Sequence, residues 1–161
     1  MNEIAAKPPG ASHKIWLSSY PPGVPETLPP LVHQSLGQLF EHSCKRYADR
    51  QAFTSMGKTL TFRELEAESR KIGAWLQAQG LIKGDRVAVM LPNILQNPVI
   101  VYAILRAGLV VVNVNPLYTP RELEYQLKDS GAKALFVLEN FADTAQQVLS
   151  GTDVKHVVVA T

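Results

Sequence analysis

Five glutamates in two short clusters are the first residues whose type and spacing could do chemistry. They lie at positions 64, 66 and 68 and at positions 122 and 124. Neighbouring carboxylates can divide the roles of general acid and general base. Both clusters, however, fall in the first turns of predicted helices, where negative charge complements the helix dipole and the outer face is solvated. We therefore interpret these glutamates as structural.

Histidine and cysteine offer little support for a metal site or a nucleophile. The histidines at positions 13, 33, 42 and 156 are not spaced from another histidine, a cysteine or a carboxylate as metal ligands usually are. Cys44 is the single cysteine, so no internal disulfide can form. It falls on the apolar side of a predicted helix, and we expect a buried, inert thiol in a reducing compartment.

Glycine and serine patterns do not indicate a phosphate site or a nucleophile elbow. Gly80, Gly84 and Gly108 match neither the dinucleotide fingerprint nor the phosphate-loop pattern. The serines at positions 12, 18 and 19 lie in a proline-rich stretch and not between a strand and a helix. We assign no catalytic, cofactor-binding or metal-binding residue within these positions.

Open parallel sheets usually meet their ligands at the carboxyl ends of their strands. The residues at the predicted strand ends are Pro92, Asn93, Asn115, Glu139, Asn140 and Thr161. Asparagine could orient a substrate there, but it is also a common residue of strand-ending turns. We favour the turn interpretation and assign none of these residues to a site.

Apolar periodicity and capping signals predict the helices. Thr61 with Glu64 and Thr119 with Glu122 each form a capping box, in which two side chains satisfy free amides at a helix start. Ser35 is a further N-cap. The expected helices cover residues 35–49, 62–79, 98–107, 120–130 and 141–149. In the first of them the predicted buried face comprises Leu36, Leu39, Phe40, Cys44 and Tyr47.

Four short apolar runs, at residues 87–91, 109–114, 134–138 and 156–160, alternate with these helices. Strands without polar alternation are typical of a parallel sheet buried on both faces. The sequence therefore predicts an α/β fold with a partial doubly wound, mostly parallel sheet and flanking helices. Residues 51–55 and 59–61 are expected to form a hairpin around Gly57.

Composition sets limits on the domains and the partners. Seven prolines between positions 7 and 30 predict an extended arm over residues 1–34, followed by one α/β unit over residues 35–161. A net charge of +2 without a basic block argues against nucleic-acid binding. Residues 1–10 show no export signal, and prolines and amides interrupt the uncharged stretch from Val87 to Leu105, so we expect a cytoplasmic protein without a membrane span.

Several segments resemble the bacterial long-chain fatty-acid–CoA ligases of the adenylate-forming superfamily. The narrowest similarities are VNVNPLYTPRELE, from Val112 to Glu124, and WLSSYPPGVP, from Trp16. Others are RYADRQAF from Arg46, MGKTLTFRELE from Met56, KGDRVAVMLPN from Lys83 and ILRAGLVVVNVNP from Ile104. The resemblance extends from about Ile15 to Ala160, and TFRELE and GDRVAVMLPN are shared by the wider superfamily.

The resemblance implies that a complete enzyme joins a fatty acid to coenzyme A through an acyl adenylate, with ATP, Mg²⁺ and coenzyme A as cofactors. It implies that residues 35–161 form the amino-terminal subdomain, which ends before the phosphate loop, so that these residues alone would be inactive and hold no cofactor. Peripheral association with the inner face of the membrane, a homodimer and self-association through an uncovered sheet edge are further expectations. Two alternatives remain: a non-catalytic acyl-binding or protein-interaction module, and an adenylate-forming ligase for an aryl or medium-chain acid.

Overall fold

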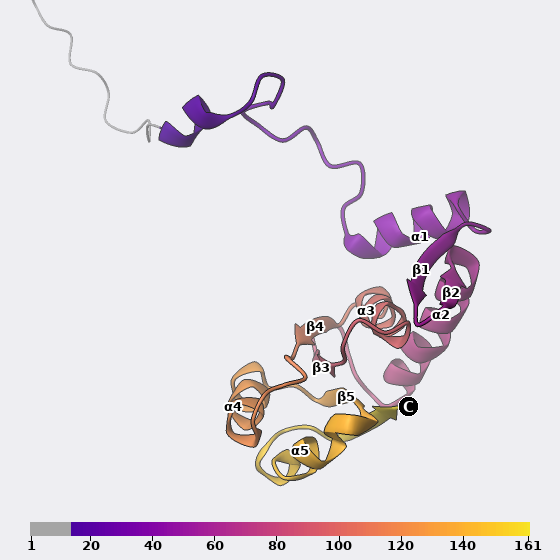
Figure 1. Ribbon diagram of the computed structural model, residues 1–161, viewed down its shortest axis with the longest axis vertical. Coiled ribbons are helices and arrows are strands. Elements are labelled where there is room, and N and C mark those ends of the chain that lie inside the picture. Colours follow the sequence, from indigo (N-terminus) through magenta and orange to yellow (C-terminus); the bar gives the residue numbers. More distant parts are fainter. Residues whose placement is uncertain (1–13) are drawn as a thin grey trace, which may run out of the picture. The chain divides into compact units, whose positions relative to one another are not determined.

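The computed structural model describes residues 14–161 (Figure 1). The chain divides into a first unit that ends at Val32 and a second unit, here called the body, that covers His33–Thr161. In the first unit the only regular element among the described residues is the 3₁₀ helix η1, Ile15–Ser19. This turn departs from the predicted extended arm, because no proline interrupts it and Ser18 Oγ donates to the Ile15 carbonyl at 2.8 Å.

The body alternates helices and strands in the predicted order. Its helices are α1 (Leu36–Arg46), α2 (Phe62–Ala78), α3 (Gln96–Arg106), α4 (Pro120–Ser130) and α5 (Ala142–Gln146), with short 3₁₀ turns η2 (Glu139–Phe141) and η3 (Leu149–Gly151). Its strands are β1 (Gln51–Ser55), β2 (Lys58–Thr61), β3 (Arg86–Met90), β4 (Val110–Asn113), β5 (Ala134–Leu138) and β6 (His156–Ala160). Among residues 14–161 no helix is both long enough and apolar enough to cross a membrane.

Four strands form one parallel sheet in the order β4-β3-β5-β6. Val87 of β3 pairs with Val111 of β4 on one side and with Ala134 of β5 on the other. Strand β3 therefore lies between two strands that come later in the chain, which is the arrangement of a doubly wound sheet. This result confirms the predicted α/β fold and its parallel sheet.

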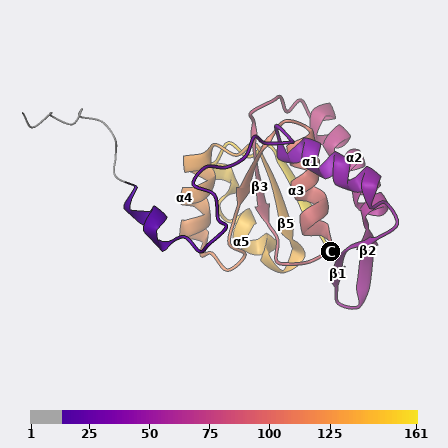
Figure 2. The same cartoon turned by 90° about the horizontal axis from the view of Figure 1, so that it is seen from above.

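The two faces of the sheet carry different helices (Figures 1 and 2). Helices α2 and α3 pack on one face, where their apolar side chains meet Val87, Val89 and Phe136. Helices α4 and α5 pack on the other, where Leu123 and Leu127 are fully buried against the sheet. We call these the α2/α3 face and the α4/α5 face. Alternate residues of each strand point to opposite faces, so one apolar run serves both cores.

Capping boxes begin α2 and α4 as predicted. Glu64 N donates to Thr61 Oγ1 at 3.3 Å, and Glu64 Oε2 accepts from Thr61 N at 2.8 Å. Thr119 and Glu122 repeat the arrangement, with Glu122 Oε2 at 2.8 Å from Thr119 N. These bonds fix the two helix starts and hence the side chains that each helix presents to the sheet.

The predicted β1–β2 hairpin is present, with Ser55 opposite Lys58. Its two-residue turn places both Met56 and Gly57 at positive φ, 50° and 74° respectively. Two positive φ angles are the signature of a type I′ turn, which suits the twist of a hairpin. Glycine adopts this conformation freely, whereas Met56 adopts it at a steric cost.

Helix α1 differs from its prediction in length and in its buried face. It ends at Arg46 and not near Asp49, and only Phe40 and Cys44 are buried. Leu36 and Leu39, which we predicted to be buried, are 62% and 44% exposed. The helix contacts α2 and α3 through Phe40 and Cys44, so a narrow strip of it is covered instead of the whole apolar face.

The predicted helix over residues 141–149 is also different, because the segment forms η2, the five-residue α5 and η3. No side chain caps the start of α5. Without a cap, and with Ser150 and Gly151 at its end, the segment forms separate turns.

Candidate functional site

The body carries an open apolar groove of about 650 Å³ on the α2/α3 face. It lies near the carboxyl ends of β5 and β6, and the β1–β2 hairpin forms one of its walls. Its apolar lining consists of Met56, Leu60, Ile72, Ile94, Leu95, Val99, Ile100, Phe136, Leu138, Val158 and Ala160. A groove of this kind can bind an apolar group by removing it from water.

Strand pairing determines which side chains form the groove floor. Phe136 of β5 pairs with Val158 of β6, and Leu138 pairs with Ala160. These four residues share the α2/α3 face. Leu135 and Val137, which alternate with Phe136 and Leu138 along β5, point to the core on the α4/α5 face. The sequence did not reveal this groove, because its walls come from segments that are far apart in the chain.

Three polar side chains around the groove are bonded within the protein. Gln96 Nε2, at the start of α3, donates to the carbonyl of Thr161 at 3.2 Å, and Ser55 Oγ donates to the carbonyl of Asn93 at 3.3 Å. Glu68, at the edge of the groove, forms an ion pair with Lys71 at 2.6 Å. These bonds fix the loops around the groove, so the site offers apolar contact more than free polar groups.

The asparagines that follow the strands act partly as predicted. Asn115 Oδ1 accepts from the amide of Leu117 at 3.0 Å, which is the Asx turn that the turn interpretation requires. Sequence reasoning missed Asn97, whose Nδ2 donates to the carbonyls of Leu91 and Pro92 at 3.1 and 3.3 Å. Asn140 and Thr161 line the groove.

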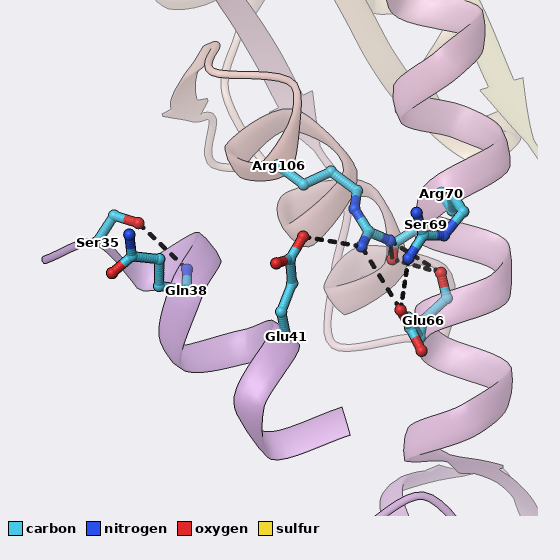
Figure 3. A network of polar contacts seen from close by, with 7 residues as sticks. All are labelled: Ser35, Gln38, Glu41, Glu66, Ser69, Arg70 and Arg106. Atoms are coloured by element: carbon cyan, nitrogen blue, oxygen red, sulfur yellow. Dashed lines mark hydrogen bonds and ion pairs between the residues drawn. The ribbon is translucent and has the colours of Figure 1, made fainter. Parts of the chain in front are cut away.

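Arg106, which the sequence did not single out, is a buried charge at the junction of three helices (Figure 3). Its side chain is 8% exposed. Nη1 donates to the Glu66 carbonyl and to Ser69 Oγ, both at 3.0 Å, and Nη2 lies 3.5 Å from Glu41 Oε1. In the sequence, an arginine in the last turn of a helix indicates only a favourable interaction with the helix dipole. The role of Arg106 becomes visible only when α1 and α2 pack around it.

The glutamate clusters have the structural roles that we expected. Backbone and side-chain hydrogen bonds from Thr61 and Thr119 lower the pKa of Glu64 and Glu122 respectively. Glu66 pairs with Arg70 at 2.6 Å, and Glu124 pairs with Lys128 at the same distance. The lowered pKa values make Glu64 and Glu122 poor proton donors near neutral pH.

Cys44 is buried as predicted, with 1% of its surface exposed. Burial, reinforced by Glu66, raises the pKa of its thiol to about 11, so the thiolate required for reaction is scarce. The structure also brings His33 and His42 together, with ring centroids 5.1 Å apart, although the sequence did not predict this contact. Across residues 14–161 no group of three or more His, Cys, Asp or Glu residues could hold a metal ion.

Another ion pair, between a largely buried carboxylate and an exposed lysine, lies at the opposite, amino-terminal ends of the strands. Asp85, which precedes β3, pairs with Lys133, which precedes β5, at 2.7 Å. The hydrogen bond from Lys133, with one from the Ile82 amide, lowers the pKa of Asp85. Because it lies away from the strand ends that border the groove, this pair fixes the entry of two strands and takes no part in the groove.

Comparison with known proteins identifies the family. The family model described as "AMP-binding enzyme" matches residues 40–161. The chain is 56% identical to a long-chain-fatty-acid–CoA ligase of Salmonella typhimurium over 147 residues, which are 91% of this chain and 26% of that protein. It is 44% identical to the enzyme of the same name from Bacillus subtilis over 80% of this chain and 23% of that protein.

Solved structures agree on the fold. A long-chain-fatty-acid–CoA ligase from Archaeoglobus fulgidus superposes with a TM-score of 0.72 and 28% identity, over 78% of this chain and 27% of that chain. An anthranilate CoA ligase in complex with anthranoyl-AMP gives a TM-score of 0.76 at 24% identity, over 83% of this chain and 26% of that chain, and shows the fold alone. This chain spans about a quarter of the length of the curated relatives it matches. It belongs to the AMP-binding enzyme family.

Proposed function

We propose that this chain forms part of an ATP-dependent long-chain fatty-acid–CoA ligase. In the complete reaction the fatty carboxylate attacks the α-phosphorus of ATP and pyrophosphate leaves, and the thiol of coenzyme A then displaces AMP from the acyl adenylate. The observation that carries the proposal is the 56% identity to a ligase of this name over 91% of the chain.

The chemistry explains why such an enzyme uses ATP. A carboxylate is a poor acyl donor, because its negative charge repels nucleophiles and oxide is a poor leaving group. Joining the carboxylate to AMP supplies a better leaving group, and Mg²⁺ neutralises charge on the phosphates. We assign no residue of this chain to ATP, Mg²⁺ or coenzyme A, because its sequence shows no phosphate-loop pattern.

Within such an enzyme, residues 35–161 would act as the amino-terminal subdomain that builds the sheet and helps to enclose the acyl chain. The apolar groove on the α2/α3 face supports this role, because its lining suits hydrocarbon. The proposal places residues 1–34 outside the subdomain, as an arm.

A chimera tests the proposal. The aligned residues of the Salmonella typhimurium ligase are replaced by those of this chain, and palmitoyl-CoA formation is measured. We expect the chimera to form palmitoyl-CoA, since the segment is similar along most of its length. The parent ligase is the positive control. A chimera that folds, as shown by circular dichroism, but neither adenylates palmitate nor forms the thioester would contradict the proposal.

The 161 residues alone should be inactive. We expect no pyrophosphate release above background when the purified chain is mixed with palmitate, Mg²⁺ and ATP, because no phosphate-binding pattern was found in its sequence. The alternative of a stand-alone acyl-binding module predicts palmitate binding by calorimetry instead. Strong binding by the chain, with an inactive chimera, would favour that module. Activity of the chimera on benzoate or octanoate in place of palmitate would favour a ligase for another acid.

We also propose that the chain self-associates through β6. We propose further that the protein is cytoplasmic and contacts the inner face of the membrane peripherally. Strand β6 is an edge of the sheet, and its Val157 and Val159 are exposed because the short α5 leaves them uncovered. Light scattering should show concentration-dependent mass that Val159→Lys abolishes. Co-sedimentation with anionic vesicles tests the membrane contact. A constant monomer mass and no sedimentation would contradict these two proposals.

A further inference from the structure

Helix α1 is attached to the rest of the body along a narrow strip. Only Phe40 and Cys44 are buried, while Leu36 and Leu39 face outward. The Phe40 ring stacks on the Tyr102 ring of α3, with centroids 4.0 Å apart and planes 8° from parallel. Phe40 and Cys44 meet Leu65 and Val99 in a small apolar cluster, which is separate from the larger core that α2 and α3 form on the sheet.

The polar part of this attachment passes through Arg106 (Figure 3). On the α2 side the guanidinium is bonded at 3.0 Å to the Glu66 carbonyl and to Ser69 Oγ. On the α1 side it meets only the carboxylate of Glu41, at 3.5 Å, and the face of the Phe40 ring, at 5.7 Å. Glu66 also offers its carboxylate at 3.9 Å.

The two sides of Arg106 are therefore unequal. When α1 moves away, the guanidinium keeps its bonds to α2 and gains water, so no charge is left buried without a partner. Glu41, already half exposed, becomes fully hydrated. The electrostatic resistance to opening is accordingly small, as it is for an exposed ion pair.

Helices α2 and α3 do not share this property. Gly73 of α2 lies against α3 so closely that a Cβ there would be 3.2 Å from the Ala103 carbonyl and 3.3 Å from Arg106 Cγ. This close contact, with the apolar core on the sheet, holds the two helices together independently of α1.

We propose that α1 opens and closes as a unit on the folded α2–α3 pair, and that the Glu41–Arg106 contact sets the balance between the two states. Opening uncovers Tyr102 and the α1 strip while the sheet stays intact. This is local opening of the kind that hydrogen exchange detects in stable domains.

The protein contains its own reporter of this motion, because Cys44 is the single cysteine and is covered only while α1 is closed. The test measures the rate at which a thiol reagent in excess labels the native chain. Wild-type labelling should be faster than global unfolding and nearly independent of low concentrations of denaturant. Glu41→Gln should accelerate labelling about two- to fivefold, the factor that corresponds to an exposed ion pair.

Glu68→Gln is the matched control, since it removes a carboxylate from an exposed pair with Lys71 on α2 and should leave the rate unchanged. High salt should accelerate labelling of the wild type more than that of Glu41→Gln. The proposal is overturned if labelling follows global unfolding with its full denaturant dependence. It is also overturned if Glu41→Gln labels no faster than the wild type and the Glu68→Gln control.

Hydrogen exchange gives an independent measurement that does not depend on the thiol. Amides of residues 36–46 should exchange faster in Glu41→Gln than in the wild type, while amides of residues 134–138 should be unaffected. Equal acceleration in both segments would mean global destabilisation and would overturn the proposal.

Discussion

The two faces of β5 differ in how they are covered. Leu135 and Val137 point to the α4/α5 face and are fully buried, whereas Leu138, on the α2/α3 face, lines an open groove and is half-buried. Phe136, also on the groove side, is shielded by its neighbours. One strand of uniform apolar sequence therefore serves a packed core on one side and a concave site on the other.

The two faces also differ in the interactions that stabilise them. The α4/α5 core at β5 consists of aliphatic and aromatic side chains. The helices of the α2/α3 face add the buried Arg106 and Ser69. We infer that substitutions on the first face act through lost packing, and that substitutions on the second act partly through polar contacts.

The largest expected effect compares two leucines of β5. Leu135→Ala should lower the free energy of unfolding by about 2–5 kcal/mol, because it leaves a cavity in a closed core. Leu138→Ala should cost only about 1 kcal/mol, since part of its side chain already meets water. Urea denaturation of both variants measures the difference. Equal losses would show that the groove is as tightly packed as the core.

A second test compares two arginines near Glu66. Arg106→Met should cost about 2 kcal/mol, because Ser69 Oγ and the Glu66 carbonyl each lose a hydrogen bond from the guanidinium in a buried place. Arg70→Met removes an exposed partner of the same Glu66 and should change stability by less than about 0.5 kcal/mol. Similar results for the two in thermal unfolding would contradict the structural role of Arg106.

Loss of an N-cap from either capping box should lower stability by the same amount on the two faces of the sheet. Thr61→Ala at the start of α2 and Thr119→Ala at the start of α4 should each cost about 1 kcal/mol, as loss of an N-cap does. Chemical denaturation of the two single variants and of the double variant checks this. The two losses should add, since the sites share no contact.

The same boxes predict a pH dependence. Glu64 and Glu122 have lowered pKa values in the folded chain, so each binds protons more weakly folded than unfolded. Their contribution is complete above the unfolded pKa of about 4.3 and is lost as the pH falls through the lower folded pKa. Stability measured from pH 6 to pH 3 should fall less steeply in Glu64→Gln and Glu122→Gln than in the wild type.

The smallest expected effect concerns the groove wall. Met56 is 93% exposed and has a φ of 50°, a conformation that asparagine tolerates better than methionine in a type I′ turn. Met56→Asn should stabilise the chain by about 0.5 kcal/mol, whereas Gly57→Ala should destabilise it. Differential scanning calorimetry measures both. A destabilising Met56→Asn would show that methionine contacts matter more than backbone strain.

Most of the fold could be predicted because its signals are local. The capping boxes, the apolar strands and the hairpin are each specified by fewer than about ten neighbouring residues. The error at α1 occurred where long-range packing decides the outcome. Leu36 and Leu39 follow the periodicity of a buried face, but α1 contacts the body through Phe40 and Cys44 and leaves them exposed.

The groove and Arg106 could not be predicted for the same reason. The groove needs β5, β6, α2, α3 and the hairpin to meet, and no single segment carries its pattern. Arg106 shows its importance only when Glu41 and Ser69 are placed beside it. The asparagine interpretation succeeded at Asn115, because an Asx turn involves only neighbouring residues.

The position of β3 between β4 and β5 has a consequence for synthesis on the ribosome. Strand β3 is made before both of its neighbours, so its edges stay unpaired until later segments emerge. Helix α3 and β4 follow it directly and can complete a right-handed β3-α3-β4 unit first. The opposite edge of β3 then stays unpaired until β5 emerges, and an unpaired strand edge makes a folding intermediate prone to aggregation.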